Sequence, residues 1–387
     1  MQKPLQGIKV LDLGQGVAAP YCGLLMAQYG AEVIKVEPLN GDWMRGLGKN
    51  WKGQTAYSVT YNLGKKGIAV DLKKQEGINL ILKIAETCDV VLENFRPGVV
   101  DRLGIGFSDI KAINDKVLYV SVSGFGQTGP YNERPGSDGV LQAFSGFVSI
   151  NKDNNGFPHR VGTTVVDALT GLCTFQATSM ELFGGITEAK FLDISLLQSA
   201  AVLLMPNIAD FSLNQGPALA LNPPAGTYKT KDGWFGVSIV KEQNFADLCR
   251  LIGVEEAISD ERFKTSEKRA ENITQITEII QSKLKNKTSE YWDRAFKEAG
   301  LLANPDNDFG DWLDDEHDKA IEGYGIVEQP EVGKVPIARL PGGLKMDGIA
   351  PNIGSNTKDV MLEYGYSLDQ VEQLNREKVV FAPELSN

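Results

Sequence analysis

One aspartate, Asp167, stands where the chain changes character, and its type and position could support nucleophilic chemistry. The β-branched run at 160–166 before it is typical of a strand, and Ala168–Leu182 has the apolar spacing of a helix. A carboxylate at such a junction lies near the mouth of an α/β sheet, where it can act as a nucleophile. Aspartate also serves as a helix N-cap, because it accepts hydrogen bonds from first-turn amides. The residue by itself leaves both roles open.

A glycine-rich turn, Gly14–Ala19, follows the first expected strand and precedes an expected helix. Together with Glu37, at the end of the next strand, it loosely matches the G-x-G-x-x-A fingerprint of dinucleotide-binding proteins. Pro20 follows the fingerprint at once, and amides at a helix start can hold any phosphate group. A nicotinamide-dependent dehydrogenase is therefore one function that these residues permit.

A polar segment at 93–104 follows a buried, strand-like run, so we expect it at the carboxyl edge of the sheet, where α/β proteins bind ligands. Arg96 and Arg102 suit phosphate oxygens, and Phe95 can flank an adenine ring. Lysine pairs at 65–66 and 73–74 add positive charge nearby in sequence, although such pairs are typical of a solvated face. The segment predicts either a phosphate-binding edge or an ordinary solvated loop.

Two further segments are rich in glycine: 123–130 leaves an expected strand, and 134–139 follows it closely. Glycines at this density let the backbone approach a ligand. An ordinary flexible loop has the same composition, so the segments alone do not decide between the two.

Composition narrows the class of protein. The 387 residues exceed the size of a typical single core, which predicts two domains. The net charge of −11 argues against a nucleic-acid or membrane-surface binder, so an anionic ligand needs a local basic site. The two histidines, His159 and His317, argue against a histidine-based zinc site, and we predict no metal. Four scattered cysteines, no signal-peptide core and no long apolar run predict a cytoplasmic protein.

Strand and helix patterns alternate through the first half, which predicts a mostly parallel sheet. The expected strands are Ile8–Leu13, Ala31–Glu37, Ile68–Leu72, Asp89–Asn94 and Val117–Val122. The expected helices are Pro20–Tyr29, Gln75–Thr87, Ala168–Leu182, Leu192–Met205 and 358–376. A strand at Gly233–Val240 and charged helices at 243–299 indicate a second, smaller α+β domain. We therefore predict a large Rossmann-like domain at 1–224, a small domain at 225–325, and a return to the large domain at 326–387.

The ordered set of motifs resembles the family III CoA-transferases, a superfamily that also contains the α-methylacyl-CoA racemases. The motifs that carry the resemblance are Leu5–Leu13, Gly30–Pro38, Glu93–Gly98, Gly124–Pro130, Asp167 and the tail Ile353–Tyr366. They span nearly the whole chain. The resemblance implies two interlocked protomers, each with a large Rossmann-like domain and a small domain.

The resemblance also assigns roles to positions. It implies that Asp167 is the catalytic nucleophile, that acyl-CoA and a carboxylic acid are the substrates, and that no cofactor is tightly bound. Positions matching CoA contacts are Val17, Ala18, Val70, Asp71, Leu72, Lys73, Asn94, Phe95, Arg96, Arg102, Pro135, Gly136, Ser137 and Asp138. Val17 and Pro38 depart from the residues of the formyl-CoA enzymes, which removes two of the contacts made there.

Ser137 separates the two activities of the superfamily, because it occupies the place of a catalytic histidine in the racemases. A racemase needs two positioned acid/base groups, one on each face of the α carbon. A transferase needs only a carboxylate nucleophile. The sequence therefore favours transfer of CoA from an acyl-CoA to a free acid, through an aspartyl anhydride and an aspartyl-CoA thioester. An acyl-CoA racemase or isomerase is the alternative, ahead of the dehydrogenase.

Overall fold

The computed structural model describes residues 3–153, 156–216, 220–342 and 344–385. The chain forms two compact units. One comprises Met1–Met205 together with Glu322–Asn387, and the other is Pro206–Ile321. The chain thus leaves the first unit once, forms the second, and returns.

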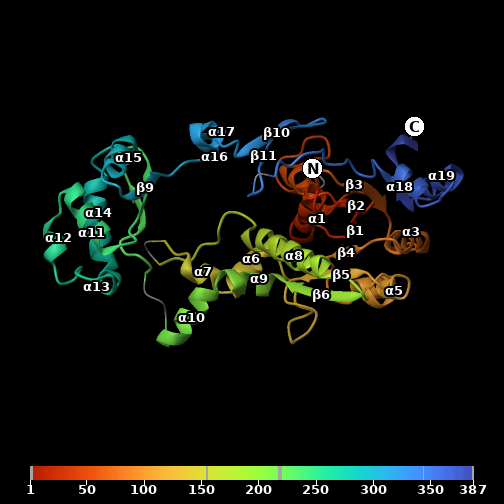
Figure 1. The fold of residues 1–387 in the computed structure, drawn as a ribbon, viewed down its shortest axis with the longest axis horizontal. Coiled ribbons are helices and arrows are strands. Elements are labelled where there is room, and N and C mark those ends of the chain that lie inside the picture. The colour runs from red at the N-terminus through yellow and green to blue at the C-terminus, as the bar shows by residue number, and fades with distance from the viewer. Residues whose placement is uncertain (1–2, 154–155, 217–219, 343, 386–387) are drawn as a thin grey trace. The chain divides into compact units, whose positions relative to one another are not determined.

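A seven-stranded sheet forms the centre of the first unit, with the strand order β12-β3-β2-β1-β4-β5-β6 (Figure 1). Its strands are β1 (Lys9–Asp12), β2 (Glu32–Glu37), β3 (Lys66–Val70), β4 (Val90–Glu93), β5 (Leu118–Ser123), β6 (Lys190–Ser195) and β12 (Val380–Phe381). Strands β1 to β6 pair in parallel, and β12 is antiparallel to β3. This order places β1 and β4, which are distant in sequence, side by side at the middle of the sheet.

Helices cover both faces of this sheet. They are α1 (Ala18–Gln28), α2 (Ala56–Asn62), α3 (Gln75–Ala85), α4 (Val99–Leu103), α5 (Phe107–Lys111), α6 (Asp138–Phe144), α7 (Phe147–Ile150), α8 (Val165–Gly184), α9 (Leu196–Leu203), α18 (Thr357–Glu363) and α19 (Leu368–Arg376). Neighbouring residues of β1 serve opposite cores: Val10 packs with residues of α1, α8 and α9, and Leu11 packs with residues of α3 and α18. Burial on both faces explains why β1 reads as a continuous apolar run.

Three predicted elements were wrong. Residues 160–164 form no strand, and α8 instead follows an irregular loop. The expected helix Leu192–Met205 is the strand β6 followed by α9, because β6 is exposed at alternate positions and lies at the sheet edge. The expected helix at 358–376 is two helices, α18 and α19, since Gly365 adopts a positive φ of 79° and Ser367 caps the second.

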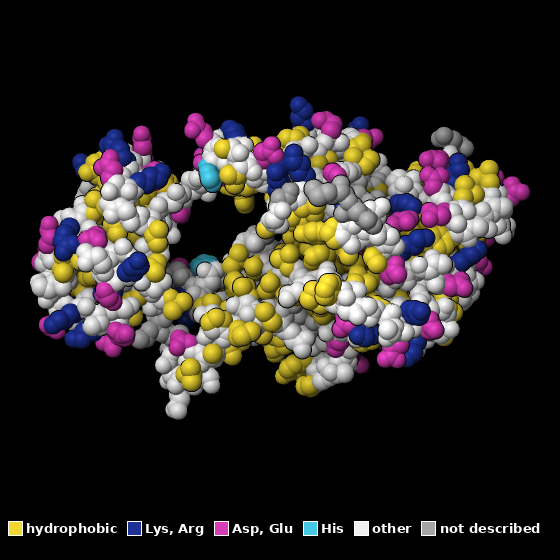
Figure 2. All heavy atoms as spheres, in the orientation of Figure 1, with side chains coloured by type: hydrophobic (Ala, Val, Ile, Leu, Met, Phe, Trp, Pro, Cys, Tyr) yellow, Lys and Arg dark blue, Asp and Glu magenta, His cyan; other side chains and the backbone are white. Residues whose placement is uncertain are grey.

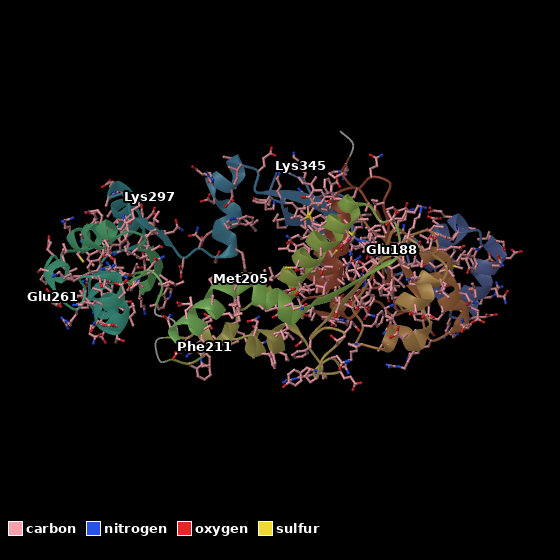
Figure 3. All side chains as sticks on the ribbon, turned by 60° about the horizontal axis from the view of Figure 1, so that its bottom comes forward. Glu188, Met205, Phe211, Glu261, Lys297 and Lys345 are labelled. Carbon is pink, nitrogen blue, oxygen red and sulfur yellow. The ribbon has the colours of Figure 1, made fainter. Side chains whose placement is uncertain are left out.

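The second unit has its own sheet and core. Its antiparallel sheet contains β7 (Gly226–Lys229), β8 (Trp234–Ser238) and β9 (Leu302–Pro305). Its helices are α10 (Met205–Asn214), most of which belongs here, α11 (Glu242–Ile252), α12 (Glu256–Ser259), α13 (Ser266–Glu271), α14 (Ile273–Leu284), α15 (Ser289–Glu298), α16 (Phe309–Asp314) and α17 (Glu316–Ala320). Phe235 and Phe296 pack in its buried core, and charged side chains such as Glu261 and Lys297 lie on its outside (Figure 3).

The hairpin of β10 (Tyr324–Gln329) and β11 (Gly333–Ala338) begins the return to the first unit. Across the described residues, no single helix is long and apolar enough to cross a membrane, and one bent pair, α9 with α10, passes that test only when the two are taken together.

Candidate active site

The carboxyl ends of the parallel strands bring several predicted site segments to one edge of the sheet. Val17 and Ala18 follow β1, Val70–Lys73 end and follow β3, and Asn94–Arg96 follow β4 directly. Strand order reverses between β1 and β4, and such a switch point leaves a crevice for ligands beyond the strand ends. The predicted segments therefore lie where an α/β fold of this topology binds its ligand.

Asn94 joins the two loops at this switch point. Its Oδ1 accepts a hydrogen bond from the Gln15 amide at 2.7 Å, and its Nδ2 donates to the Gln15 carbonyl at 2.7 Å. Both polar ends of the amide are thus used inside the protein. Asn94 therefore positions the two loops that a ligand would touch.

The glycine turn after β1 does not offer its amides to a dinucleotide. The Gly14 amide donates to Asp12 Oδ1 at 3.0 Å, and the Gly16 amide donates to both carboxylate oxygens of Asp42 at 3.1 Å. The ring of Trp43 packs against Gly16 so closely that a Cβ there would collide with it. The pyrophosphate of NAD needs these same donors. The amides of this turn are therefore used by the protein's own side chains. This removes the basis of the dehydrogenase alternative.

The residues flanking this turn are also committed. Glu37, expected near a ribose in a dinucleotide site, receives the Arg45 guanidinium at 2.6 and 2.7 Å. Val17 and Ala18 are buried, with exposed fractions of 2% and 4%. Their contact with CoA stays a prediction.

Lys65 was misplaced by the sequence interpretation, which put it on a solvated face. It is buried, and its Nζ donates to Asp12 Oδ2 at 2.8 Å and to the Pro20 carbonyl at 2.8 Å. A second buried pair joins Lys35 Nζ to Asp42 Oδ2 at 3.3 Å. Sequence reasoning missed Lys35 entirely, because an isolated lysine inside an apolar strand carries no signal of its partner. Both pairs stabilise the turn between β1 and α1.

Asp167 lies in the first turn of α8, but it does not cap the helix. The capping acceptor is Asp138, whose Oδ1 receives the Val166 amide at 2.7 Å and the Asp167 amide at 3.2 Å. Gln142 donates to the other Asp138 oxygen at 2.6 Å. Within the described part of the chain, no hydrogen bond or ion pair engages the Asp167 carboxylate itself. The side chain is therefore free to react.

Burial, reinforced by the charge of Asp138, raises the pKa of Asp167 to about 7. Tyr61 lies close enough to feel that carboxylate. Its own pKa is raised to about 12 by burial, by Tyr21 and Tyr57, and, as a smaller cause, by Asp167. The tyrosine rings pack together, with centroids 5.3 Å apart for Tyr21 and Tyr61. Sequence reasoning missed this aromatic wall, because it comes from α1 and α2 and not from the segment around Asp167.

The segment after β4 presents two arginines to solvent, Arg96 in the loop and Arg102 in α4. Arg96 and Arg102 are exposed, and no ion pair among the described residues engages either of them. Phe95 is half-buried, and its amide donates to Glu93 Oε2 at 2.7 Å. Glu93 is buried, which raises its pKa to about 7, and it borders a cavity of about 60 Å³ next to Arg96. The start of this segment is therefore fixed by a hydrogen bond to Glu93, and its two arginines have no ion-pair partner among the described residues.

The segment after β3 is tied to the C-terminal part of the chain. The Asp71 amide donates to the Val379 carbonyl at 2.7 Å, and the Lys73 amide donates to Asp71 Oδ1 at 3.0 Å. Val70 is buried, Leu72 is half-buried, and Lys73 is exposed. Lys73 is thus the member of this segment with a free charged end.

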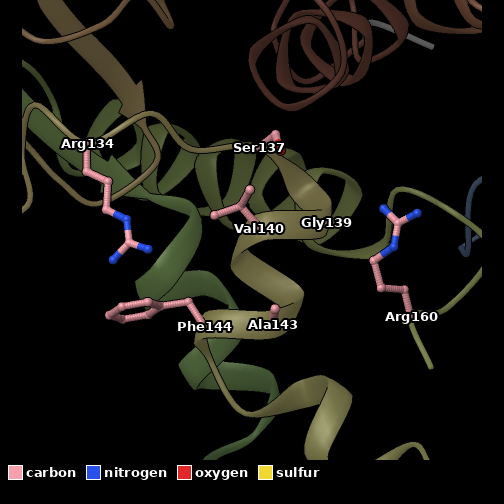
Figure 4. Close-up of a pocket in the computed structure, with 7 residues that line it drawn as sticks. All are labelled: Arg134, Ser137, Gly139, Val140, Ala143, Phe144 and Arg160. Atoms are coloured by element: carbon pink, nitrogen blue, oxygen red, sulfur yellow. The ribbon is translucent and has the colours of Figure 1, made fainter. Parts of the chain in front are cut away.

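From the segment 135–138, Ser137 lines an open hollow of about 600 Å³ beside α6 (Figure 4). Pro135, Gly136 and Ser137 are exposed, whereas Asp138 is buried as the cap of α8. The residues lining the hollow are Arg134, Ser137, Gly139, Val140, Ala143, Phe144 and Arg160. Asp138 therefore positions Asp167, and the hollow next to it carries two guanidinium groups.

The family model for CoA-transferase family III matches residues 5–357. The chain belongs to this family, and it is a CoA-transferase.

Named relatives agree with this assignment. The chain is 33% identical to the human succinyl-CoA:glutarate CoA-transferase, with 87% of this chain and 79% of the relative covered. It is 30% identical to the succinyl-CoA–D-citramalate CoA-transferase of Chloroflexus aurantiacus, over 98% of both chains. The solved structure of a CaiB/BaiF family protein from Brucella suis superimposes with a TM-score of 0.80 at 28% identity, covering 94% of this chain and all of the other.

Proposed function

We propose that this enzyme moves CoA from an acyl-CoA to a dicarboxylic acid, with Asp167 as the nucleophile. The observation that carries the proposal is the state of that side chain. Its backbone amide is fixed by Asp138 at 3.2 Å, its carboxylate has no partner among the described residues, and burial raises its pKa. A positioned but unpaired carboxylate is what covalent catalysis at a thioester needs.

The proposed reaction has three covalent steps and a return. An Asp167 oxygen attacks the thioester carbonyl, the C–S bond breaks, and an aspartyl acyl anhydride forms with release of CoA thiolate. The thiolate attacks the Asp167 carbonyl of the anhydride, which gives an aspartyl-CoA thioester and frees the donor acid. The acceptor carboxylate attacks that thioester and expels CoA thiolate. The thiolate then attacks the acceptor carbonyl of the new anhydride, forming the product thioester and restoring Asp167.

Exposed cations at the carboxyl edge of the sheet are proposed to hold the CoA phosphates. Lys73 and Arg96 lie in the loops after β3 and β4, and Arg102 lies in α4, against a net charge of −11. Charge-assisted hydrogen bonds from such groups supply binding energy remote from the reacting carbonyl. Asn94 would then act indirectly, by holding the loop that carries Arg96 against Gln15.

The acid substrate is inferred from the relatives and from charge. Both relatives compared above are named for succinyl-CoA and a second acid, glutarate or D-citramalate. Each of these acids carries two carboxylates. The hollow beside α6 offers a place for the carboxylate that does not react, because an arginine lines it.

Mass spectrometry of exchange reactions tests this proposal. The protein is incubated with succinyl-CoA, acetyl-CoA or butyryl-CoA and, in turn, with mono- and dicarboxylic acids. We expect new CoA thioesters of the dicarboxylic acids, with equal amounts of donor acid released. Hydrolysis of the donors without any new thioester would contradict CoA transfer.

The pH profile should report the ionisation of Asp167. Only the carboxylate form is a nucleophile, and its pKa is raised to about 7 by burial and by Asp138. We therefore expect kcat/KM to fall about tenfold per pH unit below that value. Asp138→Asn keeps an oxygen acceptor for the α8 amides but removes the neighbouring charge, so the acidic limb should move to lower pH. A wild-type limb near pH 4 would contradict the raised pKa.

The resemblance also leads us to propose an interlocked homodimer. On α8 and α9 the apolar side chains of Leu172, Met180, Phe183, Val202 and Leu203 are exposed, Phe183 to 89%. Hydrophobic side chains gather over these helices in Figure 2. Surfaces of this kind mark protein–protein interfaces.

Light scattering should therefore give the mass of two chains at micromolar concentration. Charged replacements at two of these positions, Met180→Glu and Phe183→Glu, should together reduce that mass or leave the chain aggregated. The same kind of change at Val240, an exposed apolar residue of the second unit, should not. A monomeric wild type would sink the dimer proposal.

A further inference from the structure

Two arginines beside α6 have no carboxylate partner among the described residues of the first unit. Arg134 and Arg160 both line the hollow beside α6, and no ion pair or side-chain hydrogen bond among the described residues engages either guanidinium. A volume of about 600 Å³ lies within the usual range of small-molecule sites, roughly 300–1,000 Å³. Unpaired guanidinium groups in a concave site are suited to a carboxylate or phosphate.

Arg160 is tied to the nucleophile through the first turns of α6. Its guanidinium lies against Gly139, so closely that a Cβ at that position would collide with it. The preceding residue, Asp138, accepts the amide of Asp167 at 3.2 Å. Gln142, one turn further on, accepts the Val161 amide at 2.9 Å and so fixes the backbone next to Arg160. The first two turns of α6 therefore contact both the Arg160 guanidinium and the backbone of Asp167.

Arg134 is held differently. Its guanidinium lies over the rings of Phe125, Tyr131 and Phe144, with centroid distances of 5.5, 5.5 and 5.3 Å. Figure 4 shows it at the opposite side of α6 from Arg160. Cation–π contacts on three rings keep it in place without a ligand. Arg134 therefore supplies a matched control, because it has the same charge, borders the same hollow, and lacks the link to Asp167.

We propose that Arg160 binds the second carboxylate of a dicarboxylic substrate, the one that is not joined to Asp167 or CoA. This inference rests on the proposed function. Ser137 offers a hydroxyl donor at the same hollow, and Val140 and Ala143 offer an apolar surface for the methylene groups between the two carboxylates. Arg160 is then the residue that makes the enzyme prefer dicarboxylic over monocarboxylic acids of equal length.

Steady-state kinetics with a matched pair of acceptors tests this role. Glutarate and valerate have the same number of carbons, and only glutarate has a second carboxylate. For Arg160→Gln we expect the KM for glutarate to rise and its kcat/KM to fall by about 10- to 100-fold, the loss of one charge-assisted contact, while kcat/KM for valerate stays unchanged. Arg160→Lys should restore part of the preference, and Arg134→Gln should leave the preference as in the wild type.

Three outcomes would overturn the role of Arg160. In the first, Arg160→Gln keeps the wild-type preference for glutarate. In the second, it lowers kcat/KM equally for both acids, which would assign the arginine to folding or subunit contacts. In the third, the wild type transfers CoA but favours valerate. That third result would support the transfer reaction and contradict the dicarboxylate site.

A binding measurement separates this inference from the proposed reaction. If the wild type transfers CoA to neither acid, the proposed reaction fails. Calorimetric titration with glutarate then decides the site alone. The proposed carboxylate site is supported if glutarate binds to the wild type and to Arg134→Gln but not to Arg160→Gln. It is overturned if glutarate does not bind, or if it binds equally well without Arg160.

Discussion

Asp167→Asn should reduce CoA transfer by about four orders of magnitude or more, the scale seen when a covalent nucleophile is removed. The fold should survive the change, because Asp138 supplies the cap of α8 and Asn has nearly the same shape. Turnover measured by mass spectrometry of product thioesters gives the first readout. Hydroxylamine added during turnover should trap the wild-type enzyme at Asp167 and leave the variant unmodified.

The same substitution should raise stability at pH 8. Burial and Asp138 raise the folded-state pKa of Asp167 from 3.8 to about 7, so the folded protein binds this proton more tightly than the unfolded chain does. Its ionisation therefore lowers stability progressively as the pH rises from about 4 to about 7, and the full cost applies above that range. Asparagine removes the cost. The melting temperatures of wild type and variant should converge near pH 4 and differ at pH 8.

A second helix carboxylate provides the control. Asp109 lies in the first turn of α5 and accepts the Gly106 amide at 3.0 Å, so it is a structural acid in the same kind of position. Asp109→Asn should retain near-wild-type turnover. Near-normal transfer in Asp167→Asn would refute the nucleophile. If Asp167→Asn loses both transfer and its folded state, the variants Asp167→Glu and Asp167→Ser are compared for hydroxylamine trapping, which separates catalysis from folding.

The largest stability effect is expected at Lys65. Lys65→Met removes the hydrogen-bonded cation of the buried Asp12. Among the described residues, that carboxylate then keeps a hydrogen bond from the Gly14 amide at 3.0 Å and the more remote charge of Lys35. Breaking one side of a buried pair typically costs about 3–5 kcal/mol. Chemical denaturation at a fixed protein concentration should show a loss of free energy of unfolding of that order.

Two comparisons test the cause of that loss. Lys66→Met removes a cation that pairs with Glu32 and Glu363 at the surface, so its cost should stay below about 1 kcal/mol. Adding Asp12→Asn to Lys65→Met removes the unpaired charge but keeps an acceptor for the Gly14 amide, and much of the lost stability should return. A double variant as unstable as Lys65→Met would show that the loss comes from packing and not from charge.

The central strands of the first unit could be predicted because each is buried on both faces. Val10 and Leu11 point to opposite cores, so β1 appears in the sequence as an uninterrupted apolar run, and β2, β4 and β5 follow the same logic. Strand β6 was mistaken for a helix. Its alternate residues are exposed, and at the sheet edge the apolar pattern lacks the continuity that identified the other strands.

The functional meaning of the glycine turn depended on one neighbouring residue, Asp12, and on two that are distant in sequence, Asp42 and Asn94. The sequence predicted free amides at Gly14 and Gly16, but the carboxylates of Asp12 and Asp42 occupy them. The amide of Gln15, which lies between these two glycines, donates to Asn94, about eighty positions further along the chain. A glycine motif indicates where the backbone can approach a ligand. Only the packing of the whole chain decides whether side chains of the protein already occupy the amides of that motif.

The sequence by itself indicated the class of this protein, because its ordered motifs resemble those of the family III CoA-transferases and a resemblance in sequence needs no knowledge of contacts. It also singled out Asp167, since an aspartate at the start of a helical pattern can be recognised from the order of residues alone. Only the tertiary structure decided that Asp138 caps that helix, that Lys65 is buried against Asp12, and that Arg160 lies against Gly139 of α6 with no ion-pair partner among the described residues. Hydrogen bonds and ion pairs between distant segments depend on how the chain packs, and local residue patterns carry no record of them.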